Sequence, residues 1–374
     1  MSVQRICDPM LPELSKFFNA PMDSVARVVS LFAVGYGVMQ LLYGPLGDRW
    51  GKYRMVIWAT LGCGFGCMLS ALSTDLDQLV AARIVTAVFS AAIIPMSLAW
   101  VGDAVDYQRR QETLARIGLG TMLGITSGQF FGGFLTDLFG WQWAFVMMAI
   151  VFWSVSFLLW RHWQQLGETN FQAQVSLGFF RQLLQAGKEA WIRTILTIAV
   201  LEGAFVLGLL AITATHLHHK FGVSLTVAGA SAALFGLGGM LYMATAKFTI
   251  RKFGETGLSR IGASALSLSF LLIAFSPWWP LAMPACFIGG FGFAMFHNTM
   301  QAHATQMVPT ARGTGVTLFA GFLFLGQSMG VLMLAHLLTY FSSSMVIGSA
   351  ACVALALGLY LAQATNKRNA QDTS

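Results

Sequence analysis

The sequence predicts an all-α integral membrane protein made of two six-helix bundles. Of the 374 residues, 56% are hydrophobic and only 10% are charged, whereas an average soluble protein is about 25% charged. A water-soluble globule could not cover so much apolar surface with so few charges. The apolar residues also form long runs, and a pattern of the first half recurs in the second. Disordered and disulfide-stapled classes are excluded by the composition and by the five scattered cysteines.

Eleven apolar runs are long enough to cross a membrane, which requires about 20 residues of helix. The runs are 25–47, 54–73, 78–101, 115–136, 142–160, 192–215, 225–247, 258–276, 280–303, 314–337 and 345–363. Residues 1–18 precede them and are too short to cross, so we expect the outer half of a truncated first span. A short interfacial helix is the alternative. This piece lacks the basic start and the cleavage site of a signal peptide.

The positive charges indicate the orientation of the chain. Of the 22 Lys and Arg residues, 17 lie in alternate loops and in the C-terminal tail. Cytoplasmic loops are enriched in these residues, so we expect that side and the C-terminus to be cytoplasmic. The expected location is the cell membrane, a bacterial-type inner membrane, crossed many times. The cations are spread over short loops and form no single basic face, which argues against nucleic acid as a partner.

A long polar segment, residues 164–190, divides the chain into two halves. We expect an N-terminal bundle over residues 1–163 and a C-terminal bundle over residues 191–374. Each half contains the same short pattern, at Gly128-Gln129-x-x-Gly132 and at Gly326-Gln327-x-x-Gly330. Two repeats of six spans predict a pseudo-two-fold molecule with a cavity between the halves, near the middle of the bilayer.

The segment between the second and third predicted spans carries a specific motif, Gly44-Pro45-Leu46-Gly47-Asp48-Arg49-Trp50-Gly51-Lys52-Tyr53-Arg54. It resembles the loop signature G-x-L-x-D-R-x-G-[RK]-[RK] of the major facilitator superfamily. Tyr53 replaces a cation of that signature, and Arg54 supplies a charge one position later. The residues that carry the motif are Gly44, Asp48, Arg49, Gly51, Lys52 and Arg54. The resemblance implies a transporter with two six-helix bundles.

Three further patterns resemble the same family. Leu79-x-x-x-Arg83 in the fourth span is similar to its L-x-x-x-R motif, and the acid and prolines of residues 8–12 resemble the first-span end of drug:proton antiporters. The fifth span is similar to the antiporter signature G-x-x-x-G-P-x-x-G-G. Its residues are Gly124, Gly128, Gln129, Gly132 and Gly133, with the glutamine in place of the proline. The resemblance implies the drug:proton antiporter or sugar-efflux branch.

The charged loop has two interpretations. Asp48 falls at the cytoplasmic end of a helix, where a carboxylate can accept hydrogen bonds from a helix N-terminus across the seam between the bundles. The loop is then a latch that holds the halves together in the outward-open state. The alternative is that Arg49, Lys52 and Arg54 serve only to set the topology.

Ionisable groups at membrane depth are costly and usually functional. Besides the histidines, four such groups are expected there: Arg5, Asp8, Arg83 and Glu202. Asp8 and Arg83 lie in the outward halves of their spans and are able to meet, so Asp8 is a candidate to load and release a proton. A static ion pair is the alternative. Glu202 is a candidate second proton site or contact to a cationic substrate, and it must be protonated, face the cavity or pair across the bundle.

Polar side chains in the later spans are candidates to line the cavity. These candidates are His297, Asn298, Gln301 and Gln327. The first three form one polar patch, for which ordinary hydrogen bonding between helices is the alternative. Gln327 occupies the place that matches Gln129 in the first half, where the pair could contact substrate or each other across the pseudo-axis. His216, with its neighbours at 218 and 219, is expected in a solvated outer loop, and no metal site is predicted.

These features predict a secondary active transporter that moves a small solute by alternating access, with proton-coupled efflux by antiport as the leading mechanism. A proton-coupled uptake symporter and a non-transporting receptor or scaffold with the same fold are the alternatives. Neither G-x-x-x-x-G-K-[ST] nor H-E-x-x-H occurs, and the polar residues are scattered, so we expect neither an enzyme nor a cofactor. The expected partners are a small-molecule substrate, protons and the lipid bilayer, with the monomer as the functional unit.

Overall fold

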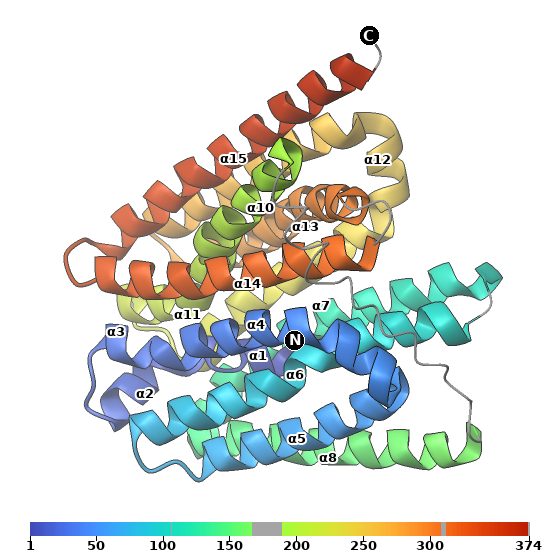
Figure 1. Cartoon of the computed structure of the whole chain (residues 1–374). Coiled ribbons are helices and arrows are strands. Elements are labelled where there is room, and N and C mark those ends of the chain that lie inside the picture. Colours follow the sequence, from blue (N-terminus) through green and yellow to red (C-terminus); the bar gives the residue numbers. More distant parts are fainter. Residues whose placement is uncertain (106, 167–188, 308–311, 373–374) are drawn as a thin grey trace.

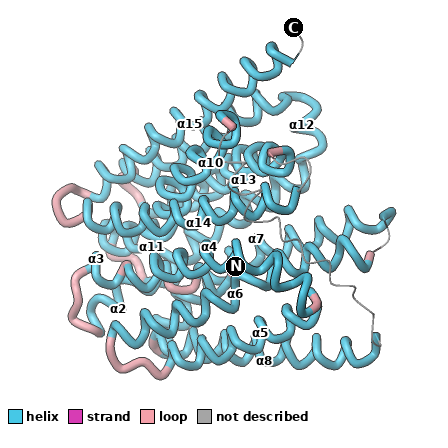
Figure 2. The backbone as a smooth tube through the Cα atoms, in the orientation of Figure 1, coloured by secondary structure: helices cyan, strands magenta, loops and turns pink. Residues whose placement is uncertain are grey.

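The computed structural model describes residues 1–105, 107–166, 189–307 and 312–372, and every regular element in these ranges is helical (Figures 1 and 2). The elements are α1 (Ser2–Arg5), η1 (Asp8–Met10), α2 (Leu11–Phe17), α3 (Met22–Val25), α4 (Arg27–Trp50), α5 (Lys52–Ala71), α6 (Leu76–Ala104), α7 (Tyr107–Phe139), α8 (Trp141–Leu166), α10 (Ala190–Glu202), η2 (Gly203–Leu207), α11 (Gly208–Phe221), α12 (Leu225–Phe275), η3 (Trp279–Leu281), α13 (Ala282–Gln306), α14 (Arg312–Leu337) and α15 (Ser343–Asp372). Helices satisfy their own backbone hydrogen bonds, which lipid cannot do for them.

The helices form two bundles that lie one above the other in Figure 1. The first bundle contains α1 to α8, and the second contains α10 to α15. They meet along two seams, where α4 packs against α14 and α7 packs against α12. Separate apolar cores fill the two bundles. The predicted fold class is therefore confirmed.

Every predicted span is almost entirely helical, although the helix bounds differ from the predicted runs, and the span 192–215 is divided among α10, η2 and α11. Nine helices in the described part of the chain are long and apolar enough to cross a membrane. One of them, α12, contains two predicted spans, and it kinks at Gly254 with φ of 61°. Glycine tolerates this conformation because it has no Cβ. The segment left between these two spans, residues 248–257, is thus helical apart from the kink.

The two ends of the molecule differ in charge. One end holds the turn between α4 and α5, the kink of α12 and the C-terminus, and we call it the cation-rich end. The opposite end holds the α5–α6, α7–α8, α11–α12 and α14–α15 turns, and we call it the cation-poor end. At the cation-rich end, Gly51 has φ of 87° and ends α4 one residue before α5 begins.

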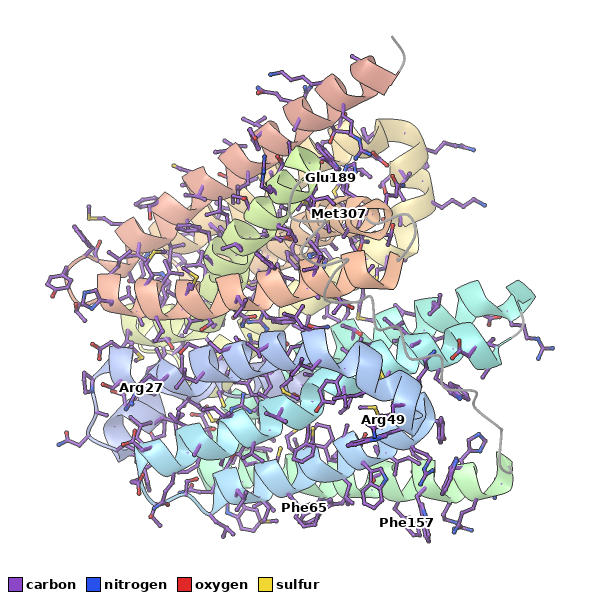
Figure 3. All side chains as sticks on the ribbon, viewed as in Figure 1. Arg27, Arg49, Phe65, Phe157, Glu189 and Met307 are labelled. Atoms are coloured by element: carbon purple, nitrogen blue, oxygen red, sulfur yellow. The ribbon has the colours of Figure 1, made fainter. Side chains whose placement is uncertain are left out.

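Large apolar side chains cover the outer face of the first bundle. Phe65 on α5 and Phe157 on α8 point away from the bundle in Figure 3, and both are more than half exposed. Charged side chains lie mostly at the ends of the helices. Because this apolar face is too large for a water-exposed surface, it is the lipid-facing side.

The first 18 residues form a broken helix that is buried in the molecule. Segments α1, η1 and α2 pack against α7 and α11, and Pro9 and Pro12 lie at or near its breaks. Ile6, Met10 and Leu14 have no exposed surface. A helix on the membrane surface would expose one face, so the interfacial alternative is wrong.

Candidate functional site

A buried ion pair lies in the broken first helix. Nη1 of Arg5 is 3.2 Å from Oδ2 of Asp8, and the two side chains are 2% and 0% exposed. The three-residue spacing places both on one side of the turn. Gln129 of α7 donates a 2.8 Å hydrogen bond from Nε2 to the same carboxylate oxygen. Taking two charges out of water is expensive, so such a pair is maintained only where its partners compensate that cost.

The same segment is bonded to the second bundle. Nη1 of Arg5 also donates to the carbonyl oxygen of Leu207 in η2, at 3.2 Å. One residue earlier, Nε2 of Gln4 donates to Oε1 of Gln327 on α14, at 3.0 Å. Gln129 and Gln327, predicted to occupy matching places, thus each contact the first helix. The Arg5–Asp8 ion pair therefore lies at the seam between the bundles.

The glycine motif of α7 provides the surface on which the first helix packs. A Cβ at Gly128 would lie 2.5 Å from the carbonyl oxygen of Ser2, and one at Gly132 would collide with the carbonyl oxygen of Ile6. Gly124 faces the backbone of Ser2 in the same way. Small residues permit this approach of two backbones inside a membrane. The last glycine of the motif, Gly133, instead faces the backbone at the start of α12.

Arg83 lies near the ion pair but has different contacts from those expected. The sequence left it open that Arg83 meets Asp8, whereas Asp8 pairs with Arg5. Nη1 of Arg83 donates to the carbonyl oxygen of Val3 at 2.8 Å, and its guanidinium lies 4.1 Å from the centre of the Phe32 ring. The guanidinium is held by a backbone oxygen and an aromatic face. It therefore supports the first helix without bonding to its carboxylate.

A second acidic centre lies in the other bundle. Oε1 of Glu202 is 3.0 Å from Nδ1 of His297 on α13, and the side chains are 0% and 19% exposed. Of the three environments that the sequence left open for Glu202, the structure shows pairing across the bundle. The π-helical turn η2 begins at the next residue, Gly203, which packs against the backbone of α14. Such turns occur frequently at functional sites.

The turn η2 connects the two acidic centres. Glu202 directly precedes it, and its last residue, Leu207, accepts the hydrogen bond from Arg5. Asp8 is therefore linked to Glu202 through one guanidinium and a single π-helical turn. The Arg5 contact and Glu202 thus lie at the two ends of one short backbone segment.

The three residues of the predicted polar patch on α13 have different surroundings. The His297 ring stacks on Phe293 with centroids 4.9 Å apart and also contacts Phe319. Asn298 is hydrogen-bonded to the side chain of Tyr242 on α12. Gln301 is exposed. The patch thus combines bonds between helices, at its first two residues, with one exposed amide.

The charged loop lies at the cation-rich end of the first bundle. Lys52 forms an ion pair with Asp103 at the end of α6, within the same bundle. Arg54 lies over the ring of Trp163, and Arg49 is exposed. The backbones of Gly44 and Asp48 belong to α4, but the surroundings of these two residues lie outside what the structure describes, as do the side chains in the first turn of α14.

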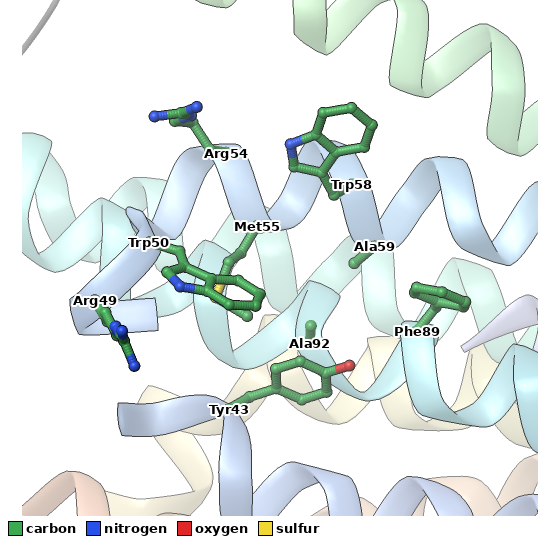
Figure 4. A pocket seen from close by; sticks show the side chains of 9 residues that line it. All are labelled: Tyr43, Arg49, Trp50, Arg54, Met55, Trp58, Ala59, Phe89 and Ala92. Carbon is green, nitrogen blue, oxygen red and sulfur yellow. The ribbon is translucent and has the colours of Figure 1, made fainter. Parts of the chain in front are cut away.

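Two cavities are found in the described part of the first bundle, and the predicted cavity between the bundles stays a prediction. The larger, of about 400 Å³, is lined by residues of α4, α5 and α6 near the charged loop (Figure 4). The smaller, of about 80 Å³, includes Gln4 and Tyr36 in its wall. Tyr36 contacts Phe324 of the second bundle, with ring centroids 4.5 Å apart. The smaller cavity therefore borders the α4–α14 seam.

The prediction of a solvated loop around His216 is wrong. This histidine lies inside α11 and is buried. Its Nδ1 is 2.8 Å from Oγ of Ser343, and its Nε2 is 3.2 Å from the carbonyl oxygen of Ile273. The helix continues for six residues beyond the predicted end at residue 215, to Phe221, and the ring is buried between α12 and α15.

Sequence reasoning assigned no role to three residues that bond across the seam, Gln4, Arg5 and Asp137. Asp137 lies near the end of α7 and accepts hydrogen bonds from Leu225 and Thr226 in the first turn of α12. Arg5 had a detectable signal, since it is a cation three residues from an acid inside an apolar segment. The signal for Asp137 was weak, because an acid at a helix end is common.

Paired helical bundles with a buried charge cluster on their seam define a multi-pass membrane protein of the transporter type. A family model described as Major Facilitator Superfamily matches residues 3–331, and the chain belongs to that superfamily. Membership places it among membrane transporters and not among enzymes.

Known proteins of the same family agree with this assignment. The chain is 25% identical over 290 residues to the uncharacterized MFS-type transporter YwfA of Bacillus subtilis, covering 75% of this chain and 68% of that protein. It is 25% identical over 287 residues to a chloramphenicol resistance protein of Pseudomonas aeruginosa, covering 75% of this chain and 66% of the relative. The chain thus spans about two thirds of the length of each. The fold is similar to that of the nucleoside transporter NupG, with a TM-score of 0.74 at 15% identity over 97% of this chain and 96% of that one.

Proposed function

We propose that the protein exports a small solute in exchange for protons, with Asp8 as the proton-carrying group. The observation that supports this proposal is the position of Arg5, whose Nη1 contacts both Asp8 of the first bundle and the Leu207 carbonyl of the second. A single guanidinium thereby joins a titratable carboxyl to the seam that must open. Coupling of protons to transport requires such a link between protonation and conformation.

The proposed cycle begins from a state that is closed at the cation-poor end. There, Asp137 of α7 bonds to the first turn of α12, and the glycines of both helices permit close contact further along the seam. We assign the cation-rich end, and with it the C-terminus, to the cytoplasm because positive charge is retained on that side. The solute then enters from the cytoplasm when that end is open.

Protonation of Asp8 changes the balance at the seam. A neutral Asp8 no longer compensates the buried charge of Arg5, and an uncompensated buried charge costs several kcal/mol. Separation of the bundles at the cation-poor end lets water reach the guanidinium and relieves that cost. Low pH therefore favours opening at this end. For exchange, the proton taken up from outside stays on Asp8 while this end closes, and re-formation of the Arg5–Asp8 pair then drives its release to the cytoplasm.

Glu202 and His297 are the proposed site of contact with the solute. The histidine covers a carboxyl that has no exposed surface, and it stacks on Phe293, so a solute that displaces it meets an aromatic wall and an acid. An uncharged or cationic aromatic solute fits this chemistry. The relative named as a chloramphenicol resistance protein supports a drug-like solute.

The two bundles, over residues 1–163 and 191–374, are proposed to rock as rigid bodies joined by the segment 164–190, with the monomer as the functional unit. The charged loop around Asp48 is the proposed latch of the opposite, outward-open state. Uptake by symport would use the same groups, with the solute moving inward together with the proton. A receptor that binds solute without moving it is distinguished by the absence of solute flux.

Transport by purified protein in liposomes tests the proposal. We expect a pH gradient to drive accumulation of a drug-like solute, and Asp8→Asn to abolish the effect of the gradient while leaving solute binding measurable. The control is Asp77→Asn, which removes an acid that is 81% exposed and paired with Arg27. Gradient-driven transport that survives Asp8→Asn at the level of the control contradicts the proposed role.

A further inference from the structure

A cavity of about 400 Å³ lies on the first bundle at its cation-rich end (Figure 4). Its walls come from three helices that meet below the turn at Gly51. They are Tyr43, Arg49 and Trp50 of α4, Arg54, Met55, Trp58 and Ala59 of α5, and Phe89 and Ala92 of α6. The α4–α5 turn thus forms the charged end of a largely apolar cavity.

The cavity faces lipid and not the seam between the bundles. Helix α5 packs against α4, α6 and α8, all of the first bundle. Trp58 is 63% exposed, and Phe65, two helical turns further along the same face, is 56% exposed. Since this face of α5 is the lipid-facing side, a molecule in the bilayer reaches the cavity directly.

Charge and aromatic character are separated within the cavity. Figure 4 shows Arg49 and Arg54 at one side and Phe89 at the other. Both arginines are exposed at the helix ends, at the level where phospholipid headgroups lie. Trp50 and Trp58 stand between the charged end and the apolar interior, as tryptophans do at a membrane interface. Tryptophans that served only as interfacial anchors would not require a cavity between them.

We infer that this cavity binds one anionic phospholipid of the leaflet at the cation-rich end. The two guanidiniums bind the phosphate, for which arginine is suited by its planar array of donors. An acyl chain lies over Trp58 and extends along Ala59 towards Phe89. Basic pockets of this kind, next to membrane-spanning helices, recognise anionic headgroups. Such a lipid contacts the end of α4 and the start of α5, and therefore the segment that carries the charged loop.

Binding of lipids to the purified full-length chain, followed by native mass spectrometry, tests this inference. We expect phosphatidylglycerol to bind more tightly than phosphatidylcholine. The double variant Arg49→Gln/Arg54→Gln should weaken phosphatidylglycerol binding by about fivefold for each arginine, the usual contribution of a basic residue near an anionic bilayer. Inorganic phosphate at the same concentration should not displace the lipid, because it lacks the acyl chain.

A matched control removes the same charge elsewhere. Arg251 and Arg260 are exposed at the cation-rich end of the second bundle, and Arg251→Gln/Arg260→Gln should leave lipid binding within about twofold of the native protein, since contributions fall off with distance. In addition, Ala59→Phe keeps every charge and fills the apolar part of the cavity, so it should weaken binding of the lipid but not the weak binding of phosphate.

Three outcomes overturn the inference. These are equal affinity for the two lipids, an equal loss in both arginine double variants, and displacement of the lipid by phosphate alone. The arginine side chains lie on the surface, so their variants should fold, and unchanged thermal unfolding in detergent verifies this. If Ala59→Phe unfolds the protein, the comparison of lipid binding between the two arginine double variants still tests the inference.

Discussion

Asp137 and Thr226 join the two bundles at the cation-poor end. Oδ2 of Asp137, near the end of α7, lies 2.6 Å from both the backbone nitrogen and the hydroxyl oxygen of Thr226, in the first turn of α12. Oδ1 of Asp137 accepts a further bond from the Leu225 nitrogen, at 3.3 Å. A carboxylate of one bundle thus caps a helix of the other, where free N–H groups and the helix dipole favour negative charge. In the proposed cycle, this contact stabilises the closed seam.

Removal of the cap should favour opening at this end. Loss of a capping side chain costs about 1 kcal/mol, and the cost falls only on the state in which the seam is closed. We expect Asp137→Ala to raise the population of the open form about fivefold. Electron-spin distances between labels at Leu72 and Tyr340, both exposed at this end, measure that population. The labels require a Cys352→Ser background, since Cys352 is the exposed cysteine among the five.

The control for this prediction is Asp75→Ala. Asp75 caps α6 by accepting a 2.8 Å hydrogen bond from the Gln78 nitrogen. The cap is lost there within a single bundle, so stability should fall without a shift in the label distances. Equal distance changes in the two variants would show that Asp137 has no special role at the seam.

The glycine motif offers a second prediction. Gly128→Ala places a methyl group 2.5 Å from the Ser2 carbonyl, so the first helix must move away from α7 and the protein should lose stability and transport. Gly120→Ala on the same helix meets nothing within 4 Å and should be neutral or stabilising by about 0.5–1 kcal/mol, because alanine favours helix. Thermal unfolding in detergent compares them. Similar midpoints for the two variants would refute the packing role.

Arg5→Gln should destabilise the protein strongly. The change leaves the Asp8 carboxylate buried without its counter-charge, which typically costs about 3–5 kcal/mol. Adding Asp8→Asn removes that charge and should restore much of the stability, although not proton-coupled transport. Chemical unfolding of the single and double variants measures the coupling. Additive losses in the double variant would mean that the two side chains act independently.

His297→Phe tests the second acidic centre. Phenylalanine keeps the stacking on Phe293 but removes the hydrogen bond to Glu202, so we expect transport to fall about tenfold or more, the scale of one bond to a charged group. His336→Phe is the control, because this exposed histidine also contacts an aromatic ring, that of Tyr340, edge to face. Initial rates of solute transport in liposomes compare the two variants. Equal rates would exclude a role for the Glu202–His297 pair in transport.

The sequence predicts the helices well because each span is recorded locally, in about 20 consecutive apolar residues. It predicts which ionisable groups lie at membrane depth for the same reason. It does not predict their partners. Asp8 has Arg83 and Arg5 within reach, and only the packing of the first helix on the glycines of α7 selects Arg5.

The sequence does not predict the contacts between the bundles either, for a related reason. The Asp137 cap and the Gln4–Gln327 bond depend on the relative position of helices that are far apart in sequence, with separations of 89 and 323 residues. The π-helical turn after Glu202 depends on the close approach of Gly203 to α14. No periodic pattern in a single span contains that information.

The most direct test of alternating access combines two pairs of spin labels on one protein. One pair, at Leu72 and Tyr340, reports on the cation-poor end; the other, at Glu112 and Lys252, reports on the cation-rich end. Lowering the pH should lengthen the first distance and shorten the second, and Asp8→Asn should hold the low-pH distances at every pH. Distances that stay fixed, that change in the same direction at both ends, or that still respond to pH in Asp8→Asn would contradict the account.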